Sequence, residues 1–130
     1  MDAMDQIRET FFQECEELME VLEDGLNDMD AGEHDGETVN AIFRAVHSIK
    51  GGAGAFGLDS LVSFAHTFET TLDEVRGGRL EVSADLMRVF LRSADQLRDL
   101  ISDATSGTES NPESAEGLIE ELRTLSLIHI

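Results

Sequence analysis

The chain has 130 residues, enough for one domain that buries about two-thirds of the surface exposed by its unfolded form. Its 28 acidic residues outnumber 9 basic ones, and the formal charge of −19 argues against nucleic acids and anionic membranes as partners. A protein partner with a basic surface is the natural counterpart. Cys15 is the only cysteine, and we find neither a signal peptide nor an apolar run of about 18 residues. We therefore expect a soluble cytoplasmic protein that does not insert into membranes.

The first predicted element is a long amphipathic helix from about Asp5 to Asp30. Apolar residues recur there at steps of three and four, and acidic residues fill most other positions. The apolar stripe consists of Ile7, Phe11, Cys15, Leu18, Leu22, Leu26 and Met29. The polar segment AGEHDGE, residues 31–37, then predicts a loop.

Two further helices are predicted to form a hairpin. The second runs from about Glu37 to Ala53, and residues 54–57 form the turn. The third is capped near Asp59 or Ser60 and stops at Gly77-Gly78, a common helix C-terminal signal. Their stripes are Val39, Ile42, Phe43, Val46, Ile49 and Ala53 on the second helix, and Leu61, Phe64, Ala65, Phe68, Leu72 and Val75 on the third.

A fourth helix is expected after Ser83, and a shorter fifth helix after the cap pair Asn111-Pro112. Their stripes are Leu86, Phe90, Ala94, Leu97 and Ile101, then Leu118, Leu122 and Leu125. Four stripes with short connections predict an all-α, up-and-down antiparallel four-helix bundle in residues 1–104. A linker at 105–112 and an accessory C-terminal helix in 113–130 follow it.

The segment AVHSIKGGAGAFG, residues 45–57, combines helical periodicity with glycines that destabilise a helix. Gly51, Gly52 and Gly54 together cost about 3 kcal/mol relative to alanine. At 100° per residue, His47 lies at the edge of the apolar stripe, and Gly51 and Gly54 lie on the same side. The glycines therefore clear space for a bulky group to approach His47, and the chain's only lysine, Lys50, lies within reach of that histidine.

The same construction places Glu69 at the matching angle on the third helix. In an antiparallel hairpin with its turn near residue 57, positions 47 and 69 lie within roughly 3 Å of the same height. His47 and Glu69 are therefore predicted to be neighbours. A carboxylate that accepts the Nδ1 proton leaves Nε2 free as a nucleophile, and Lys50 supplies a positive charge for an incoming phosphoryl oxygen. His66 is expected at the edge of the same surface.

The segment around His47 and its flanking sequences resemble those of a known family. HSIKGGAGAFG, with NAIFRAV upstream and FAHTFETTLDEVRGG downstream, is similar to the histidine phosphotransfer (HPt) domain of CheA-type chemotaxis kinases. The similarity covers about residues 5–104. The family motif, a phosphorylated histidine followed by lysine and glycine, matches His47, Lys50 and Gly51. The partner carboxylate of the family matches Glu69, and its second histidine matches His66.

The resemblance implies a two-step phosphorelay. A separate CheA-type kinase domain, which binds ATP and Mg²⁺, transfers the γ-phosphoryl group to Nε2 of His47. The group then passes to an aspartate of a response regulator of the CheY or CheB type. The chain has no ATP-binding motif, so by itself it is expected to be a cofactor-free carrier and not an enzyme. The resemblance further implies that the domain is monomeric and that its parent protein is a histidine kinase.

Two other functions remain open from the residues. His47, His66 and Glu69 could supply three ligands to a metal ion, as helical bundles often do, although no Glu-x-x-His pair occurs. A purely structural bundle is the other alternative.

Overall fold

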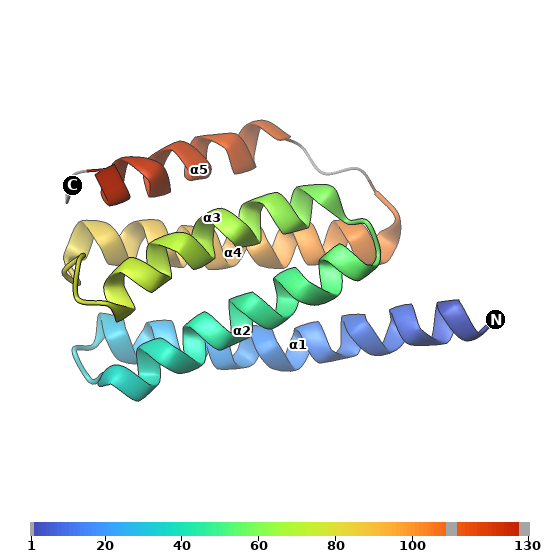
Figure 1. Cartoon of the computed structure of the whole chain (residues 1–130), viewed down its shortest axis with the longest axis horizontal. Helices are drawn as coiled ribbons and strands as arrows, with labels where there is room; N and C mark the ends of the chain where they lie inside the picture. The colour runs from blue at the N-terminus through green and yellow to red at the C-terminus, as the bar shows by residue number, and fades with distance from the viewer. Residues whose placement is uncertain (1, 109–111, 128–130) are drawn as a thin grey trace.

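The chain folds into five helices in a computed structural model that describes residues 2–108 and 112–127 (Figure 1). Within these residues no strand is present, which confirms the all-α prediction. The helices are α1 (Ala3–Asp30), α2 (Gly36–Ala55), α3 (Asp59–Arg76), α4 (Ala84–Ser106) and α5 (Pro112–Leu127).

Helices α1 to α4 form the predicted antiparallel bundle. Helix α2 packs between α1 and α3, and α4 closes the ring by packing against α1 and α3. Helix α5 lies outside this ring, against α3 and α4 (Figure 1). His47 belongs to α2 and Glu69 to α3. In the described part of the chain α5 makes no contact with α2, and the His47 side chain stays exposed.

The core contains most of the predicted apolar stripes. The six stripe residues of α2 and the six of α3 all face the core, although Phe43 and Val75 remain partly exposed. Ile7 was predicted to belong to the buried stripe of the first helix, and this prediction is wrong, because the residue is 58% exposed. The N-terminal end of α1 extends past the turn between α2 and α3 (Figure 1), so the first turns of α1 lack a full set of neighbours.

At the N-termini of α1, α2 and α4, the side chain of the N-cap residue accepts a hydrogen bond from a backbone amide. Asp2 and Asp35 form capping boxes at α1 and α2, and Ser83 accepts a hydrogen bond from the Leu86 amide at the start of α4, as predicted. Helix α3 differs from the prediction, because its N-cap is Leu58 and no side chain caps it. Asp59 instead places a negative charge in its first turn, where the helix dipole favours it.

The hairpin that carries the site turns later than predicted. Helix α2 continues through Gly54 to Ala55, so the turn is shorter than residues 54–57. Gly57 adopts a left-handed φ of 66°, a conformation that favours glycine, and thereby reverses the chain. At the other end, α3 stops at Arg76 before Gly77-Gly78, as predicted, with Gly78 at a φ of 75°.

Candidate functional site

The predicted proximity of His47 and Glu69 is confirmed. Nδ1 of His47 lies 2.8 Å from Oε2 of Glu69, a distance typical of a charge-assisted hydrogen bond. The His47 side chain is 61% exposed and that of Glu69 only 13%. The imidazole therefore stands at the solvent edge of the groove between α2 and α3, and the carboxylate lies deeper.

The carboxylate determines which nitrogen of the imidazole is free. An ionised carboxylate only accepts hydrogen bonds, so Nδ1 of His47 must donate its proton to Glu69. In the neutral ring the proton then resides on Nδ1, and Nε2 keeps its lone pair. Within residues 2–108 and 112–127, Glu69 is the hydrogen-bond partner of this ring. The arrangement provides a nucleophilic nitrogen that faces solvent.

Lys50 also binds Glu69. Its Nζ lies 2.9 Å from Oε1, so the two oxygens of one carboxylate serve His47 and Lys50 separately. The sequence predicted that Lys50 reaches toward His47 but did not predict this shared carboxylate. Glu69 is therefore held in place from both sides, and Lys50 brings its positive charge into the same groove.

Two opposing effects act on the pKa of Glu69. Burial of the carboxyl raises its pKa, whereas the hydrogen bonds and positive charges of Lys50 and His47 lower it. The favourable contacts prevail, and the pKa of Glu69 lies below its ordinary value. The carboxylate is thus ionised over the whole neutral range.

Sequence reasoning missed a stack of side chains next to the histidine. The Phe43 ring lies nearly parallel to the imidazole of His47, at an interplanar angle of 10° and a centroid distance of 6.1 Å. The guanidinium carbon of Arg76 lies 3.8 Å from the centroid of the Phe43 ring. The i, i+4 spacing of Phe43 and His47 was the available signal. Arg76 also forms an ion pair with Asp73 of the same helix.

The three glycines after Lys50 have different surroundings. A Cβ atom added at Gly51 or Gly54 would meet nothing within 4 Å, so both glycines border open space. A Cβ atom at Gly52 would overlap the ring of Phe11. Gly52 therefore serves the packing of α1 on α2, a role that the sequence did not predict.

Neither His66 nor His34 forms a hydrogen bond with His47 or Glu69, and His129 lies outside the described residues. His66 is exposed on α3 and lines a groove of about 360 Å³ that α5 borders with Arg123. His34 lies in the loop before α2, as expected. Among the described residues no group of three or more side chains is arranged to hold a metal ion, so nothing there supports the metal alternative.

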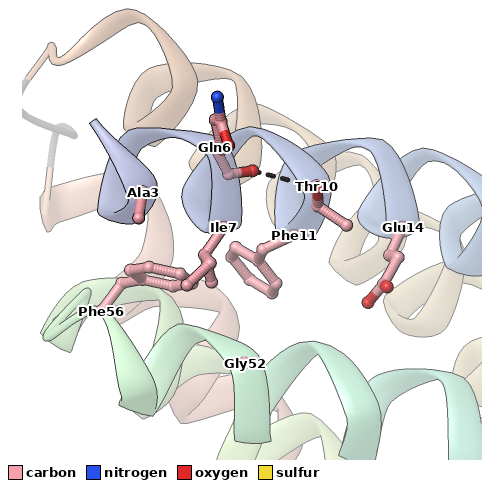
Figure 2. A pocket seen from close by; sticks show the side chains of 8 residues that line it. All are labelled: Ala3, Gln6, Ile7, Thr10, Phe11, Glu14, Gly52 and Phe56. Atoms are coloured by element: carbon pink, nitrogen blue, oxygen red, sulfur yellow. Dashed lines mark hydrogen bonds between the residues drawn. The ribbon is translucent and has the colours of Figure 1, made fainter. Parts of the chain in front are cut away.

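A separate pocket lies on the opposite flank of α2, between α1 and α2 (Figure 2). It has a volume of about 530 Å³, and its lining comes from the start of α1 and the end of α2, including Ile7, Phe11, Gly52 and Phe56. His47 contacts α3, whereas Gly52 faces Phe11 of α1. The pocket is therefore separate from the groove that holds the imidazole. None of the helices in the described part of the chain combines the length and apolar character needed to cross a bilayer.

Comparison with known proteins agrees with the helical arrangement. The model of the family described as "Hpt domain" matches residues 6–107. The chain is 58% identical over 123 residues to the chemotaxis protein CheA of Rhizobium meliloti, covering 95% of this chain and 16% of that protein. It is 39% identical over 127 residues to CheA of Salmonella typhimurium, covering 98% and 19%. The chain thus spans less than a fifth of the length of these relatives.

Two solved structures have the same fold. The phosphorylated P1 domain of CheA3, in complex with CheY6 from R. sphaeroides, matches with a TM-score of 0.87 and 27% identity, over 97% of this chain and 99% of that chain. The CheA phosphotransferase domain from Thermotoga maritima matches with a TM-score of 0.71 and 28% identity, over 81% of this chain and 99% of that chain. With a family match across most of its length and a five-helix structure that superposes on these domains, the chain belongs to the Hpt domain family.

Proposed function

We propose that this chain is the phosphotransfer domain of a CheA-type chemotaxis kinase and that His47 carries the phosphoryl group. Its donor is ATP bound with Mg²⁺ to a separate kinase domain. Its acceptor is an aspartate of a response regulator of the CheY or CheB type. One relative supports the second step, since its P1 domain is described as phosphorylated and in complex with CheY6.

The observation that carries the proposal is the 2.8 Å contact between Nδ1 of His47 and Glu69 at an exposed edge of the bundle. A hydrogen bond from Nδ1 to a carboxylate fixes the ring tautomer and raises the basicity of Nε2. The same ring is open to solvent, so a second domain can bring its reacting group to within bonding distance.

The first step forms a bond between Nε2 of His47 and the γ-phosphorus and breaks the bond between that phosphorus and the β–γ bridging oxygen, so that ADP leaves. The proton on Nδ1 stays in place, and the phosphorylated ring becomes positively charged. Glu69 stabilises this charge because its carboxylate already accepts the Nδ1 proton. Lys50 lies beside the carboxylate and offers a positive charge to the phosphoryl oxygens.

The second step reverses the bonding at Nε2. An aspartate oxygen of the response regulator attacks the phosphorus, and the P–N bond breaks with its electron pair returning to Nε2. The leaving group is the neutral imidazole with its proton still on Nδ1, so no proton has to be supplied. His47 is thereby ready for another cycle. Gly51 and Gly54 support both steps, because no side chain at these positions crowds the approach.

A phosphotransfer assay tests the assignment of His47. The wild-type domain is incubated with radiolabelled ATP, Mg²⁺ and the kinase domain of a CheA relative, and then with a panel of receiver domains. We expect acid-labile, base-stable label on the chain, followed by its transfer to a receiver. The His47→Gln variant should take up no label because it lacks the nucleophilic nitrogen.

The His66→Gln variant is the matched control, since His66 is also an exposed histidine of the same hairpin. It should keep its capacity to be labelled. Undiminished labelling of a folded His47→Gln variant would refute the proposal.

A further inference from the structure

The contacts next to His47 extend beyond Glu69 to a column of three side chains. The Phe43 ring lies one turn before His47 on α2, parallel to the imidazole within 10°. The Arg76 guanidinium, from the last turn of α3, lies over the Phe43 ring at 3.8 Å. These contacts connect the end of α3 to the imidazole by a second route, separate from Glu69.

The hydrogen bond to Glu69 by itself restrains only one edge of the imidazole. The His47 side chain is 61% exposed, so few packing contacts limit rotation of the ring about its Cβ–Cγ bond. A parallel aromatic neighbour limits this rotation, because tilting of the imidazole would lose the stacked contact. The centroid distance of 6.1 Å falls within the 4.5–7 Å range of aromatic pairs that attract one another.

Phe43 is itself well held. It packs partly buried against the hydrophobic core, and a guanidinium over an aromatic face is an attractive cation–π contact. Arg76 in turn forms an ion pair with Oδ1 of Asp73 at 2.5 Å. The ring that lies beside the imidazole is thus restrained both from the core and from α3.

We propose that Phe43 and Arg76 are positioning residues for phosphoryl transfer, because they fix the plane of the His47 imidazole and so the direction of its Nε2 lone pair. This inference rests on the proposed function of His47. Transfer needs that lone pair in line with the bond that breaks at phosphorus, and small losses of alignment slow a reaction strongly. Neither Phe43 nor Arg76 touches the reacting atoms in this role.

Nitrogen NMR of the histidine rings tests the positioning directly, without any phosphoryl transfer. In ¹⁵N-labelled wild-type protein, the signals of His47 should report a ring with its proton predominantly on Nδ1. In Phe43→Leu, which keeps an apolar side chain but loses the flat ring, we expect a larger share of the tautomer with the proton on Nε2. Phe43→Tyr restores an aromatic face and should restore the wild-type signals.

The rate of phosphorylation by phosphoramidate gives the functional readout. This small donor transfers its phosphoryl group to an imidazole and releases ammonia, so the measurement does not depend on docking of a kinase domain. We expect Phe43→Leu to be roughly three- to tenfold slower than wild type, the range that corresponds to loss of one aromatic pair. Arg76→Gln should be slowed less, and Arg76→Lys less still, because lysine keeps a cation above the ring.

The chain offers a matched control in a second cation–π pair. Arg8 lies 5.2 Å from the centroid of Phe12, a partly buried ring on α1. Phe12→Leu removes the same number of atoms from the bundle without touching the hairpin, so it should leave both the His47 signals and the rate unchanged.

Ring signals and rates equal to those of Phe12→Leu would overturn the proposal, and so would a slower rate with unchanged ring signals. If Phe43→Leu does not fold, the substitution at the partly exposed Arg76 decides in the same way. Failure of the wild-type domain to accept a phosphoryl group would instead contradict the proposed function, while the ring signals would still report on positioning.

Discussion

Glu69 is the residue on which the geometry of the site depends. Its two oxygens bind Nδ1 of His47 at 2.8 Å and Nζ of Lys50 at 2.9 Å, so neither partner competes for the same lone pairs. Lys50 restrains the carboxylate, and the carboxylate restrains the imidazole. One partly buried acid thereby couples the positive charge of Lys50 to the orientation of the His47 imidazole.

The lowered pKa of Glu69 predicts how the stability of the domain depends on pH. The ordinary value is 4.5, and the folded state holds the pKa below it. The stabilisation from the ionised carboxylate is therefore fully present above about pH 4.5 and is lost as the pH falls through the lower, folded-state pKa. Wild type should exceed Glu69→Gln in free energy of unfolding at pH 7, and the difference should shrink below pH 4.5.

Urea unfolding of both proteins between pH 7 and pH 2.5 measures this difference. Hydrogen bonds from the backbone and side chain of Thr38 also lower the pKa of Asp35. Asp35 is present in both proteins, so its contribution to the loss of stability at low pH cancels in the difference. A difference in unfolding free energy that stays constant with pH would contradict the prediction.

Helix α2 combines two demands within one turn. Gly51 and Gly54 face open space beside the site, whereas Gly52 allows the Phe11 ring to pack closely on the helix backbone. Phe11 cannot move aside easily, because it is buried and contacts Phe56 at a centroid distance of 5.5 Å. These glycines lower the helix propensity of α2. In return, Gly52 allows α1 to pack closely on one flank, and Gly51 and Gly54 leave the approach to His47 open on the other.

This division predicts opposite effects of one substitution at adjacent positions. Gly52→Ala should destabilise the domain by about 1–3 kcal/mol, because the added methyl group overlaps Phe11 in a tightly packed contact. Gly51→Ala should stabilise it by about 0.5–1 kcal/mol, since alanine favours the helix and meets no neighbour. Chemical denaturation of the two variants checks the signs. Equal effects at both positions would contradict the assignment.

At the scale of elements, most of the structure could be predicted from local sequence signals. The apolar periodicity located all five helices, and the sequence also predicted Ser83 as the N-cap of α4. The predicted cap of α5, Asn111, lies outside the described residues. The start of α3 could not be predicted from a cap residue, because Leu58 has no capping side chain. The end of α2 was placed too early, since glycines that usually end a helix here continue it to Ala55.

The whole molecule is a four-helix ring with α5 packed against α3 and α4. Ala115, Leu118 and Leu122 of α5 are buried, and Arg92 of α4 forms an ion pair with Glu121 at 3.0 Å. We propose that residues 1–104 contain all that phosphotransfer requires and that α5 is an accessory helix. On this proposal α5 contributes to the free energy of folding but takes no part in phosphoryl transfer.

A substitution in α5 tests that division. Leu122→Ala should lower the free energy of unfolding by about 2–5 kcal/mol, because Leu122 is fully buried. Labelling of His47 in the folded variant should stay at the wild-type rate. Glu120→Ala, at an exposed position of the same helix, is the control and should change stability by less than about 0.5 kcal/mol. A folded Leu122→Ala domain that accepts phosphoryl groups slowly would contradict the division.

The amino-acid sequence by itself determined the helices, their apolar faces and the approach of His47 to Glu69. These properties follow from helical geometry and from the short turn between α2 and α3, which are local along the chain. The tertiary structure decided that Lys50 shares Glu69, that Arg76 covers Phe43, that Gly52 receives Phe11 and that Ile7 remains exposed. Each of these depends on the relative placement of two helices or on the length by which one extends past another. Periodicity describes one helix at a time, so it does not contain that information.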